Sequence, residues 1–298
     1  MKPVRLSTFP LNKPFNLLDP INPFSEVVLR LVVGLFTDSP SVIGTASILC
    51  GNLLVTAKHV IDDLIRSKSS QQSDSQKVTI NHDLVAIQIL PGPEYYIWHI
   101  IEATADPLTD LLLLHLGNPP SGSNYGTEIK WKQFRVNPFP PTIGERIAAI
   151  GYRKSTVKVS KKLDGSNHID INDEAIISVG EVMEIFEWKR DNVMLPFPCY
   201  QVNARFDGGM SGGPVFDETG CLCGVICSNI SDSHLTGKPV SYVSTLWPLF
   251  RLIISAGRGD KYPRGVPYPV IELTRGKQIA VPEAQRLEDW FSKHIVRS

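Results

Sequence analysis

A glycine-rich hexapeptide, GMSGGP at residues 209–214, combines a potential serine nucleophile with a turn that could bind an oxyanion. A serine hydroxyl is a weak nucleophile near neutral pH, so it needs a base beside it. The attacked carbonyl also needs N–H donors aimed at the negative charge that develops on its oxygen. Glycine lets the chain turn so that the amides of Gly209 and Ser211 converge, and the glycines after Ser211 let the turn pack without a Cβ. The motif therefore predicts nucleophilic catalysis by Ser211.

Two other segments supply the base and the carboxylate that such a serine requires. His59 follows the apolar run Leu53–Ala57, which has the pattern of a strand leading into a short helix. Asp110 precedes the apolar residues 111–114, which have the pattern of a buried strand. We expect His59 to act as general base and Asp110 to orient its imidazole. Asp106 is the competing carboxylate, but it is followed by a proline and lies further from the apolar run.

The order His, Asp, Ser along the chain is one of those in which this triad occurs. With these three segments the sequence resembles the serine peptidases of the trypsin/chymotrypsin fold. Residues 141–152, 178–182 and 202–211 resemble the HtrA/Deg-like branch, and residues 224–229 resemble the strand that lines the substrate cleft. The similarity covers roughly residues 26–256, and we expect no PDZ domain, a module that many HtrA relatives carry.

The resemblance implies an all-β fold of two packed six-stranded Greek-key barrels, with a C-terminal helix and a short appendage. The expected parts are a proline-rich N-terminal arm at 1–25, a first barrel at 26–118 with His59 and Asp110, a second barrel at 119–256 with Ser211, and an appendage at 257–298. A linker is expected at residues 118–126, and the helix that closes the second barrel at residues 245–256.

The appendage ends in a segment with the periodicity of an amphipathic helix, residues 282–295. Its apolar face consists of Leu287, Trp290, Phe291 and Ile295. Such a face must be buried, either on the chain's own barrels or on a partner.

The resemblance also implies where the substrate pocket lies. The cleft positions of the family put Arg205 near the base of the pocket, with Ser228, Asn229 and Ser241 around it. Arg205 could also point away on its strand, so the chemistry of the pocket stays open. Met210 stands where secreted trypsins have an aspartate that pairs with a newly cut N-terminus. We therefore expect activity without N-terminal cleavage, controlled by loop ordering or by a regulatory protein partner.

Composition agrees with a compact soluble chain that acts on polypeptides. The 298 residues are 42% hydrophobic, with a mean hydropathy of −0.03, which allows a sizeable core. Thirty basic and thirty acidic residues give a net charge of zero, so nothing indicates nucleic acid or a membrane as a partner. We expect a protein or peptide substrate and no cofactor. Strand alternation explains the spacing of Cys221, Cys223 and Cys227, so no metal is expected.

The sequence also favours a cytoplasmic location. Prolines follow Lys2 and Arg5 where a targeting segment would have an apolar core, and the apolar run at residues 27–36 is too short to cross a bilayer. Secreted trypsins form disulfides at the positions of Val60 and Asp207, neither of which is a cysteine here. We therefore expect reduced, buried thiols at all five cysteines, which are Cys50, Cys199, Cys221, Cys223 and Cys227.

Together these features predict a serine endopeptidase that hydrolyses protein or peptide bonds through an acyl-enzyme. The alternative hypothesis is a latent or catalytically silent peptidase fold that serves as a binding module. The intact set of three candidate residues argues against that alternative.

Overall fold

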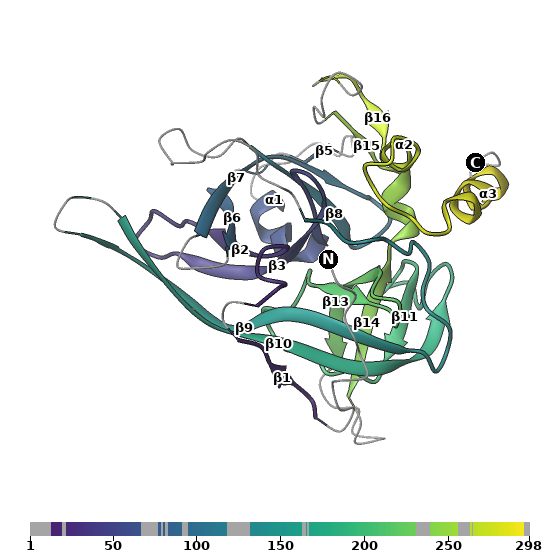
Figure 1. The fold of residues 1–298 in the computed structure, drawn as a ribbon, viewed down its shortest axis with the longest axis horizontal. Helices are drawn as coiled ribbons and strands as arrows, with labels where there is room; N and C mark the ends of the chain where they lie inside the picture. Colours follow the sequence, from purple (N-terminus) through teal and green to yellow (C-terminus); the bar gives the residue numbers. More distant parts are fainter. Residues whose placement is uncertain are drawn as a thin grey trace.

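The computed structural model describes residues 13–19, 22–66, 77–78, 80, 83–90, 95–117, 132–162, 165, 167–230, 239–255, 263 and 265–294. Within them the fold consists almost entirely of strands, and all pairs of adjacent strands are antiparallel (Figure 1). The expected linker at residues 118–126 lies outside the described residues, as do residues 1–12 of the expected N-terminal arm.

The first barrel carries His59 and Asp110. Its strands are β2 (Val28–Val33), β3 (Ser41–Cys50), β4 (Leu53–Ala57), β6 (Leu84–Ile89), β7 (Tyr95–Ala105) and β8 (Leu111–Leu116). They pair in the order β7-β6-β2-β3-β4-β8, and β7 also pairs with β8, so the sheet closes on itself. The short strand β5 (Lys77–Val78) adds to β7. All residues of β8 are buried, as its continuous apolar run predicts.

The second barrel carries Ser211. Its strands are β9 (Arg146–Lys161), β10 (Asn167–Phe186), β11 (Cys199–Val202), β12 (Pro214–Phe216), β13 (Leu222–Ile230) and β14 (Val240–Thr245). They pair in the order β10-β11-β14-β13-β12-β9, and β9 pairs with β10 to close the barrel. The expected fold of two six-stranded barrels is therefore confirmed. A further strand, β1 (Asn16–Leu17), pairs with β10 and ties the N-terminal segment to this barrel.

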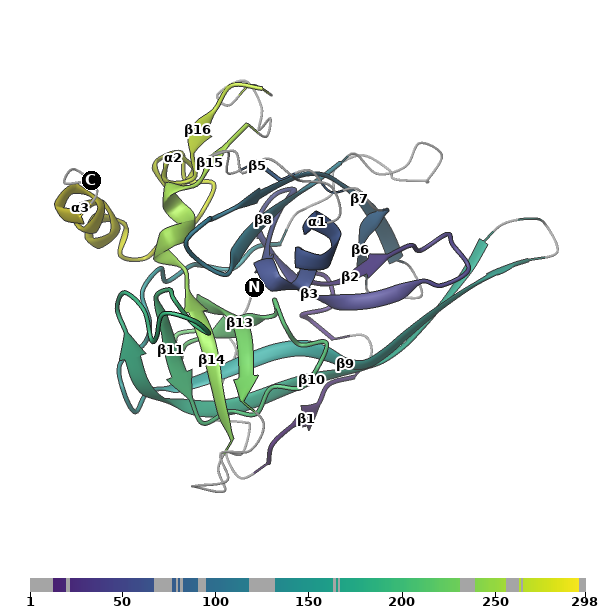
Figure 2. The same cartoon turned by 180° about the vertical axis from the view of Figure 1, so that it is seen from behind.

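The two barrels lie side by side, and β9 and β10 extend from the second along the first (Figure 2). Val157 and Ile169 of this extension pack against Leu35 and Ile87 of the first barrel. Between the barrels, the buried Arg30 of β2 forms an ion pair with Asp173 of β10. These contacts fix the orientation of one barrel on the other, and therefore the relative positions of His59 and Ser211.

The C-terminal part of the chain has a shorter closing helix than expected. The expected closing helix at residues 245–256 is reduced to a 3-10 helix, η3 (Trp247–Arg251), because β15 (Ile253–Ile254) instead pairs with β16 (Tyr268–Pro269). The helix α2 (Ile271–Arg275) follows. The amphipathic helix is present as α3 (Ala284–His294).

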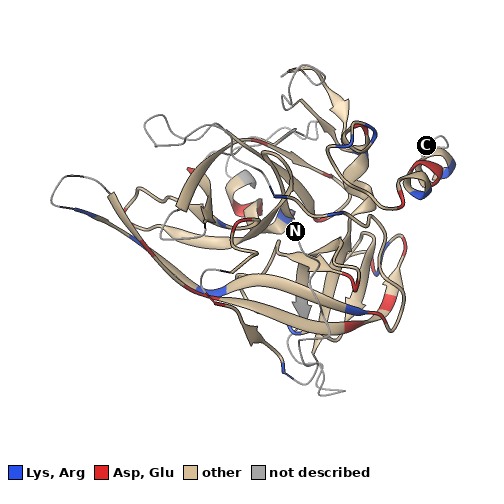
Figure 3. Ribbon diagram, in the orientation of Figure 1, with Lys and Arg blue, Asp and Glu red and all other residues tan. Residues whose placement is uncertain are grey.

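The apolar face of α3 is covered by the chain itself. Leu287 is fully buried, and Trp290 and Phe291 pack against the main core, while Ile295 lies outside the described residues. Acidic and basic residues are interspersed over both barrels and α3 (Figure 3), in keeping with a net charge of zero. Within the described ranges, no helix is long and apolar enough to cross a membrane.

Candidate active site

Strand pairing brings His59 and Asp110 together. β4 pairs with β8, and Ala57 lies opposite Leu111 at the end of the ladder. His59 follows β4 in the 3-10 helix η2 (Lys58–Ile61), and Asp110 immediately precedes β8. The backbone N–H of His59 donates to Asp110 Oδ1 at 2.8 Å, and His59 Nδ1 lies 2.7 Å from Asp110 Oδ2. Because Nδ1 donates to the carboxylate, Nε2 is the nitrogen that remains free to accept a proton.

The surroundings of His59 favour its protonated form. Burial by itself would lower the pKa of the imidazole, but the hydrogen bond to Asp110 and the negative charges of Asp110 and Asp62 outweigh burial. The pKa of His59 is therefore raised above its usual value. This is the property that a general base needs when it must hold a proton taken from a weak acid such as serine.

Asp106, the competing carboxylate, lies elsewhere. Its side chain is fully buried and accepts hydrogen bonds from Arg251 Nη2 at 2.8 Å and Arg251 Nε at 3.1 Å. This pair ties the first barrel to η3. Of the two aspartates, Asp110 is the one that contacts His59.

The loop that carries Ser211 is held by the first barrel. Thr45 of β3 donates from its backbone N–H to the Ser211 carbonyl at 2.9 Å, and from Oγ1 to the Gly209 carbonyl at 2.8 Å. Gly212 packs so closely against the first barrel that a Cβ would lie 2.0 Å from Thr56 Oγ1, and its φ is +82°. Only glycine fits there, which explains one glycine of the motif. Thr45 is not predictable from the sequence, because nothing in its local sequence distinguishes it from other strand residues.

Residues 207–210 form the turn that precedes Ser211, the candidate nucleophile. The Met210 N–H donates to the Asp207 carbonyl at 3.1 Å, and Gly209, the third residue, has a φ of +90°. A positive φ at the third position, with none at Gly208, is that of a type II turn and favours glycine. Among the described residues, the N–H groups of Gly209 and Ser211 have no hydrogen-bond acceptor, whereas those of Met210, Gly212 and Gly213 do. Two backbone donors beside the serine are therefore left for an oxyanion.

His59, Asp110 and Ser211 all line one cleft of about 650 Å³. The other lining residues are Lys58, Asp62, Cys227 and Ser228, with the segments 107–109 and 194–197 as walls. The Ser211 hydroxyl and the His59 ring, both in the described part of the chain, are not hydrogen-bonded to each other. In free enzymes this bond is often long and tightens only when substrate binds.

The residues expected around the pocket are only partly brought together. Ser228 lines the cleft, but Arg205 does not: its Nε donates to Asp207 at 3.1 Å and its guanidinium lies over the Phe15 ring. Ser241 is fully buried in β14, away from the cleft lining, because strand alternation turns it into the barrel. The side chain of Asn229 lies outside the described residues. Of the expected pocket residues, Ser228 thus lies at this cleft, whereas Arg205 and Ser241 are not among its lining residues.

Apolar residues that were not among the predicted site residues form the walls of the cleft. Leu108 and Met194 are 66% and 69% exposed, and Phe197 lies beside Leu195 and Pro196 in the same lining. The apolar character of residues 193–198, VMLPFP, is the sequence signal that could have found this wall. The loop is shaped by Asp191, whose Oδ1 accepts N–H bonds from the three following residues Val193, Met194 and Leu195.

All five cysteines are free and buried. Burial raises the pKa of Cys199 to about 12. Cys227 lines the cleft, and burial together with the negative charge of Asp110 raises its pKa well above the usual value for a thiol. Cys227 is therefore protonated and a poor nucleophile. Ser211 remains the candidate nucleophile in the cleft. In the described part of the chain, no three His, Cys, Asp or Glu side chains are close enough to hold a metal.

Three solved structures illustrate what the chain is similar to. The HtrA-type protease AlgW with a tripeptide is 18% identical, with a TM-score of 0.46 and coverage of 76% of this chain. This chain spans only 59% of the length of that AlgW chain. The Rv3671c protease from M. tuberculosis in its active form is 14% identical, with coverage of 80% of this chain and 87% of that one and a TM-score of 0.43. The MamO protease domain from Magnetospirillum magneticum is 15% identical, with coverage of 74% and 92% and a TM-score of 0.43.

Among curated proteins no match to this chain was found. The family model described as "Trypsin-like peptidase domain" matches residues 44–225. The match begins within β3 and ends within β13, so it includes His59, Asp110 and Ser211 and spans more than half of the 298 residues. The chain therefore belongs to the trypsin-like peptidase domain family.

Proposed function

We propose that this protein is a serine endopeptidase that hydrolyses protein or peptide bonds through an acyl-enzyme. The observation that carries the proposal is the hydrogen bond between His59 and Asp110 in the cleft that Ser211 also lines. Beside Ser211 lie two backbone N–H groups without an acceptor among the described residues. The proposal is supported by this arrangement, because the side chains and N–H groups that could serve as base, orienting carboxylate, nucleophile and oxyanion donors line or adjoin one cleft.

The first half of the reaction forms the acyl-enzyme. Ser211 Oγ attacks the carbonyl carbon of the substrate, and its proton passes to His59 Nε2. The carbonyl oxygen becomes an oxyanion, which accepts hydrogen bonds from the N–H groups of Gly209 and Ser211. Asp110 stabilises the imidazolium that has formed. His59 then gives its proton to the leaving amine as the carbon–nitrogen bond breaks.

The second half hydrolyses the acyl-enzyme. Water takes the place of the amine and gives a proton to His59 Nε2 while its oxygen attacks the acyl carbon. The same two N–H groups stabilise the second oxyanion, and the proton on His59 returns to Ser211 Oγ as the ester bond breaks. The free carboxylic acid leaves, and the enzyme regains its starting state.

The cleft favours polypeptides with apolar side chains near the scissile bond. Leu108 and Met194 expose most of their side chains at its walls, and Phe197 adds an aromatic surface. Contact with substrate would remove this apolar area from water, which stabilises the complex by roughly 25 cal/mol per Å². The five free, buried cysteines support action in a reducing compartment, for which we propose the cytoplasm.

A second candidate function is a latent peptidase fold that serves as a binding module. One observation favours it: Ser211 and His59, both among the described residues, form no hydrogen bond with each other. In this case the triad would assemble only when a partner protein orders the cleft.

Labelling with a fluorophosphonate probe tests the proposal, because the probe reacts covalently only with a serine that is activated by its base. We expect labelling of the wild type and none of Ser211→Ala. Ser292→Ala is the matched control, since Ser292 lies exposed on α3 and donates to the Glu288 carbonyl at 2.9 Å. A wild type that stays unlabelled, and that cleaves no peptide from a random library, would contradict the proposal and favour the latent fold.

A further inference from the structure

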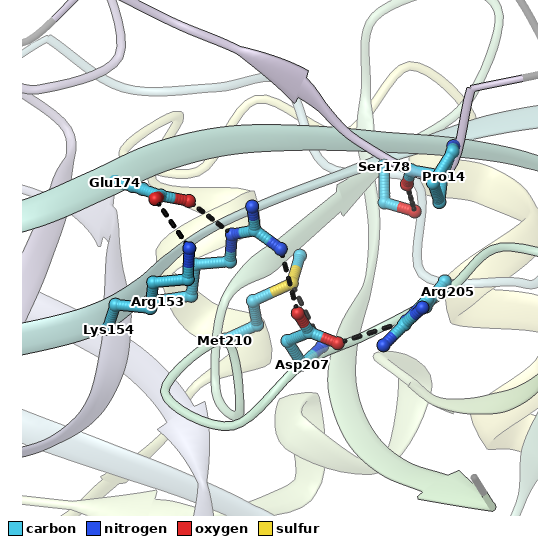
Figure 4. A network of polar contacts seen from close by, with 8 residues as sticks. All are labelled: Pro14, Arg153, Lys154, Glu174, Ser178, Arg205, Asp207 and Met210. Atoms are coloured by element: carbon cyan, nitrogen blue, oxygen red, sulfur yellow. Dashed lines mark hydrogen bonds and ion pairs between the residues drawn. The ribbon is translucent and has the colours of Figure 1, made fainter.

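Asp207, the first residue of the 207–210 turn, is held by two arginines. Arg153 Nη1 of β9 donates to Asp207 Oδ2 at 2.9 Å, and Arg205 Nε donates to Asp207 Oδ1 at 3.1 Å (Figure 4). Arg153 is itself oriented from the other side, where its Nε donates to Glu174 Oε2 at 2.6 Å. Arg153 and Asp207 are mostly covered, with side chains 18% and 24% exposed, so water screens their attraction less than it would at an open surface.

The other end of the turn is anchored as well. The Asp207 N–H donates to Met210 Sδ at 3.3 Å, and the Asp207 carbonyl accepts the Met210 N–H. Met210 is fully buried, and its backbone packs so closely on Gly151 that a Cβ at Gly151 would lie 2.8 Å from Met210 Cα. The corners of the turn are therefore fixed by a carboxylate at one end and by core packing at the other.

The type of this turn decides which way the Gly209 N–H points. Turns of type I and type II differ mainly in the orientation of the central peptide, which here joins Gly208 to Gly209 and contains the Gly209 N–H. Glycine at both central positions permits either form at little cost. The neighbours of the turn must therefore select the type II form that Gly209 adopts.

The N-terminal segment covers this ion-pair cluster. The Phe15 ring lies against both arginines, 4.4 Å from Arg153 Cζ and 5.5 Å from Arg205 Cζ. The segment is attached to the second barrel, because Ser178 Oγ donates to the Pro14 carbonyl at 3.1 Å (Figure 4) and Asn16 pairs with Ile177. A cation–π contact of this kind holds a guanidinium in place and excludes water from its ion pair.

We propose that Arg153 is a positioning residue for the oxyanion hole. Through Asp207 it keeps the 207–210 turn in the form in which the Gly209 N–H is free to bind an oxyanion, and Phe15 keeps Arg153 in place. This inference rests on the proposed endopeptidase function. It gives the N-terminal segment a role in catalysis, although that segment lies on the second barrel and outside the cleft lining.

The test compares Arg153→Met with the wild type in peptide cleavage. Loss of one oxyanion donor lowers kcat by roughly 10²–10³-fold, so partial loss of the type II turn should lower kcat by about 10- to 100-fold. The KM and the acidic limb of the pH profile should stay unchanged, because neither the cleft walls nor His59 is altered. Binding of a peptide boronate, whose boron bonds to Ser211 and places an oxygen in the oxyanion hole, should weaken by a similar factor.

Lys154→Met is the matched control. Lys154 is the next residue of β9 and donates to the same Glu174 at 2.8 Å, while Asp207 is bound by Arg153 and Arg205. This variant should keep the kcat of the wild type. Phe15→Ala provides a second route to the same effect, with Leu17→Ala as its control, because Leu17 is 69% exposed on the same segment. A melting curve for each variant shows whether it is folded at the assay temperature.

The outcomes separate this inference from the proposed function. If the wild type reacts with fluorophosphonate and both Arg153→Met and Phe15→Ala keep its kcat and boronate affinity, the positioning role is excluded and the endopeptidase stands. An equal loss in Lys154→Met would also exclude it. A wild type that does not react with fluorophosphonate would contradict the proposed endopeptidase function, and the positioning role would be excluded with it.

Discussion

The Thr45 hydroxyl of the first barrel donates a hydrogen bond of 2.8 Å to the carbonyl of Gly209 in the second. Thr45 is fully buried, and its backbone N–H also binds the Ser211 carbonyl at 2.9 Å. The Gly209 carbonyl belongs to the 207–210 turn, and the Ser211 carbonyl belongs to the candidate nucleophile that follows the turn. The loop of one barrel that carries Ser211 is thus fixed by a strand of the other, so the distance between His59 and Ser211 depends on how the barrels dock.

Thr45→Val should reduce both activity and stability. Valine keeps the shape of the side chain but leaves the Gly209 carbonyl without its donor, which costs on the order of 1–3 kcal/mol for a buried group. We expect kcat to fall by about tenfold or more, because a freed carbonyl lets the oxyanion turn relax. Steady-state kinetics and a denaturant titration measure the two effects. Thr156→Val, on the exposed part of β9, is the control, and a Thr45→Val enzyme with unchanged kcat would contradict the role of this bond.

Asp110→Asn should reduce kcat strongly, whereas Asp106→Asn should mainly reduce stability. Asparagine at 110 would keep its oxygen at the His59 backbone N–H and turn its NH2 toward Nδ1. An NH2 group donates to Nδ1, so the wrong tautomer is held and kcat should fall by about 10⁴-fold near neutral pH. Asp106 binds Arg251 and lies away from His59, so its variant should lower the melting temperature with far less effect on kcat. A catalytic loss that is larger at position 106 would assign the orienting role to the other aspartate.

The pH profile should respond to Asp62. His59 must be neutral to act as base, so activity falls as the pH decreases through the raised pKa of His59. The charge of Asp62 is one of the causes that raise this pKa. Asp62→Asn should therefore lower the pKa and move the acidic limb of kcat/KM to lower pH. Asp63→Asn, on the same helix α1 (Asp62–Arg66), is the control, and equal profiles for all three enzymes would refute the prediction.

Trp290→Ala should affect both stability and substrate binding. Trp290 of α3 stacks on Trp188 with ring centroids 6.0 Å apart and lies 5.7 Å from Trp247. Trp188 begins the loop whose residues Met194 and Phe197 form a wall of the cleft. We expect a lower melting temperature, because the variant loses the contacts of a half-buried aromatic ring with Trp188 and Trp247, and a higher KM for apolar peptides. Removal of residues 281–298 should also lower the melting temperature and raise the KM, whereas the control Ser292→Ala should change neither. A Trp290→Ala enzyme with unchanged KM would show that α3 does not influence substrate binding in the cleft.

The cysteines should be unreactive until the protein unfolds. All five are free and buried, and burial raises the pKa of Cys199 to about 12 and that of Cys223 and Cys227 well above its usual value. Since the thiolate is the reactive form, Ellman's reagent should find close to no thiol in the folded protein and five after denaturation without reductant. A melting temperature that falls on addition of dithiothreitol would instead reveal a disulfide.

The sequence by itself predicted Ser211, His59 and Asp110 as candidate residues, with Asp106 as the competing carboxylate, and its resemblance to the trypsin/chymotrypsin fold implied two barrels. The signals for the candidate residues were local: a glycine-rich turn, and apolar runs whose length and composition are typical of buried strands. Gly209 and Gly212 illustrate why such a turn can be recognised from the sequence alone. Each has a positive φ and no space for a Cβ, so the structure tolerates no other residue there.

Only the tertiary structure decided which carboxylate meets His59, where Arg205 points and what covers α3. Asp106 and Asp110 stand before the same strand, and the register that sets Ala57 opposite Leu111 places the second of them at His59. Thr45 reaches Gly209 across 164 positions of the chain. Contacts of this kind depend on how strands pair and how two barrels dock, and both are set by packing between segments far apart in sequence, which no local pattern records.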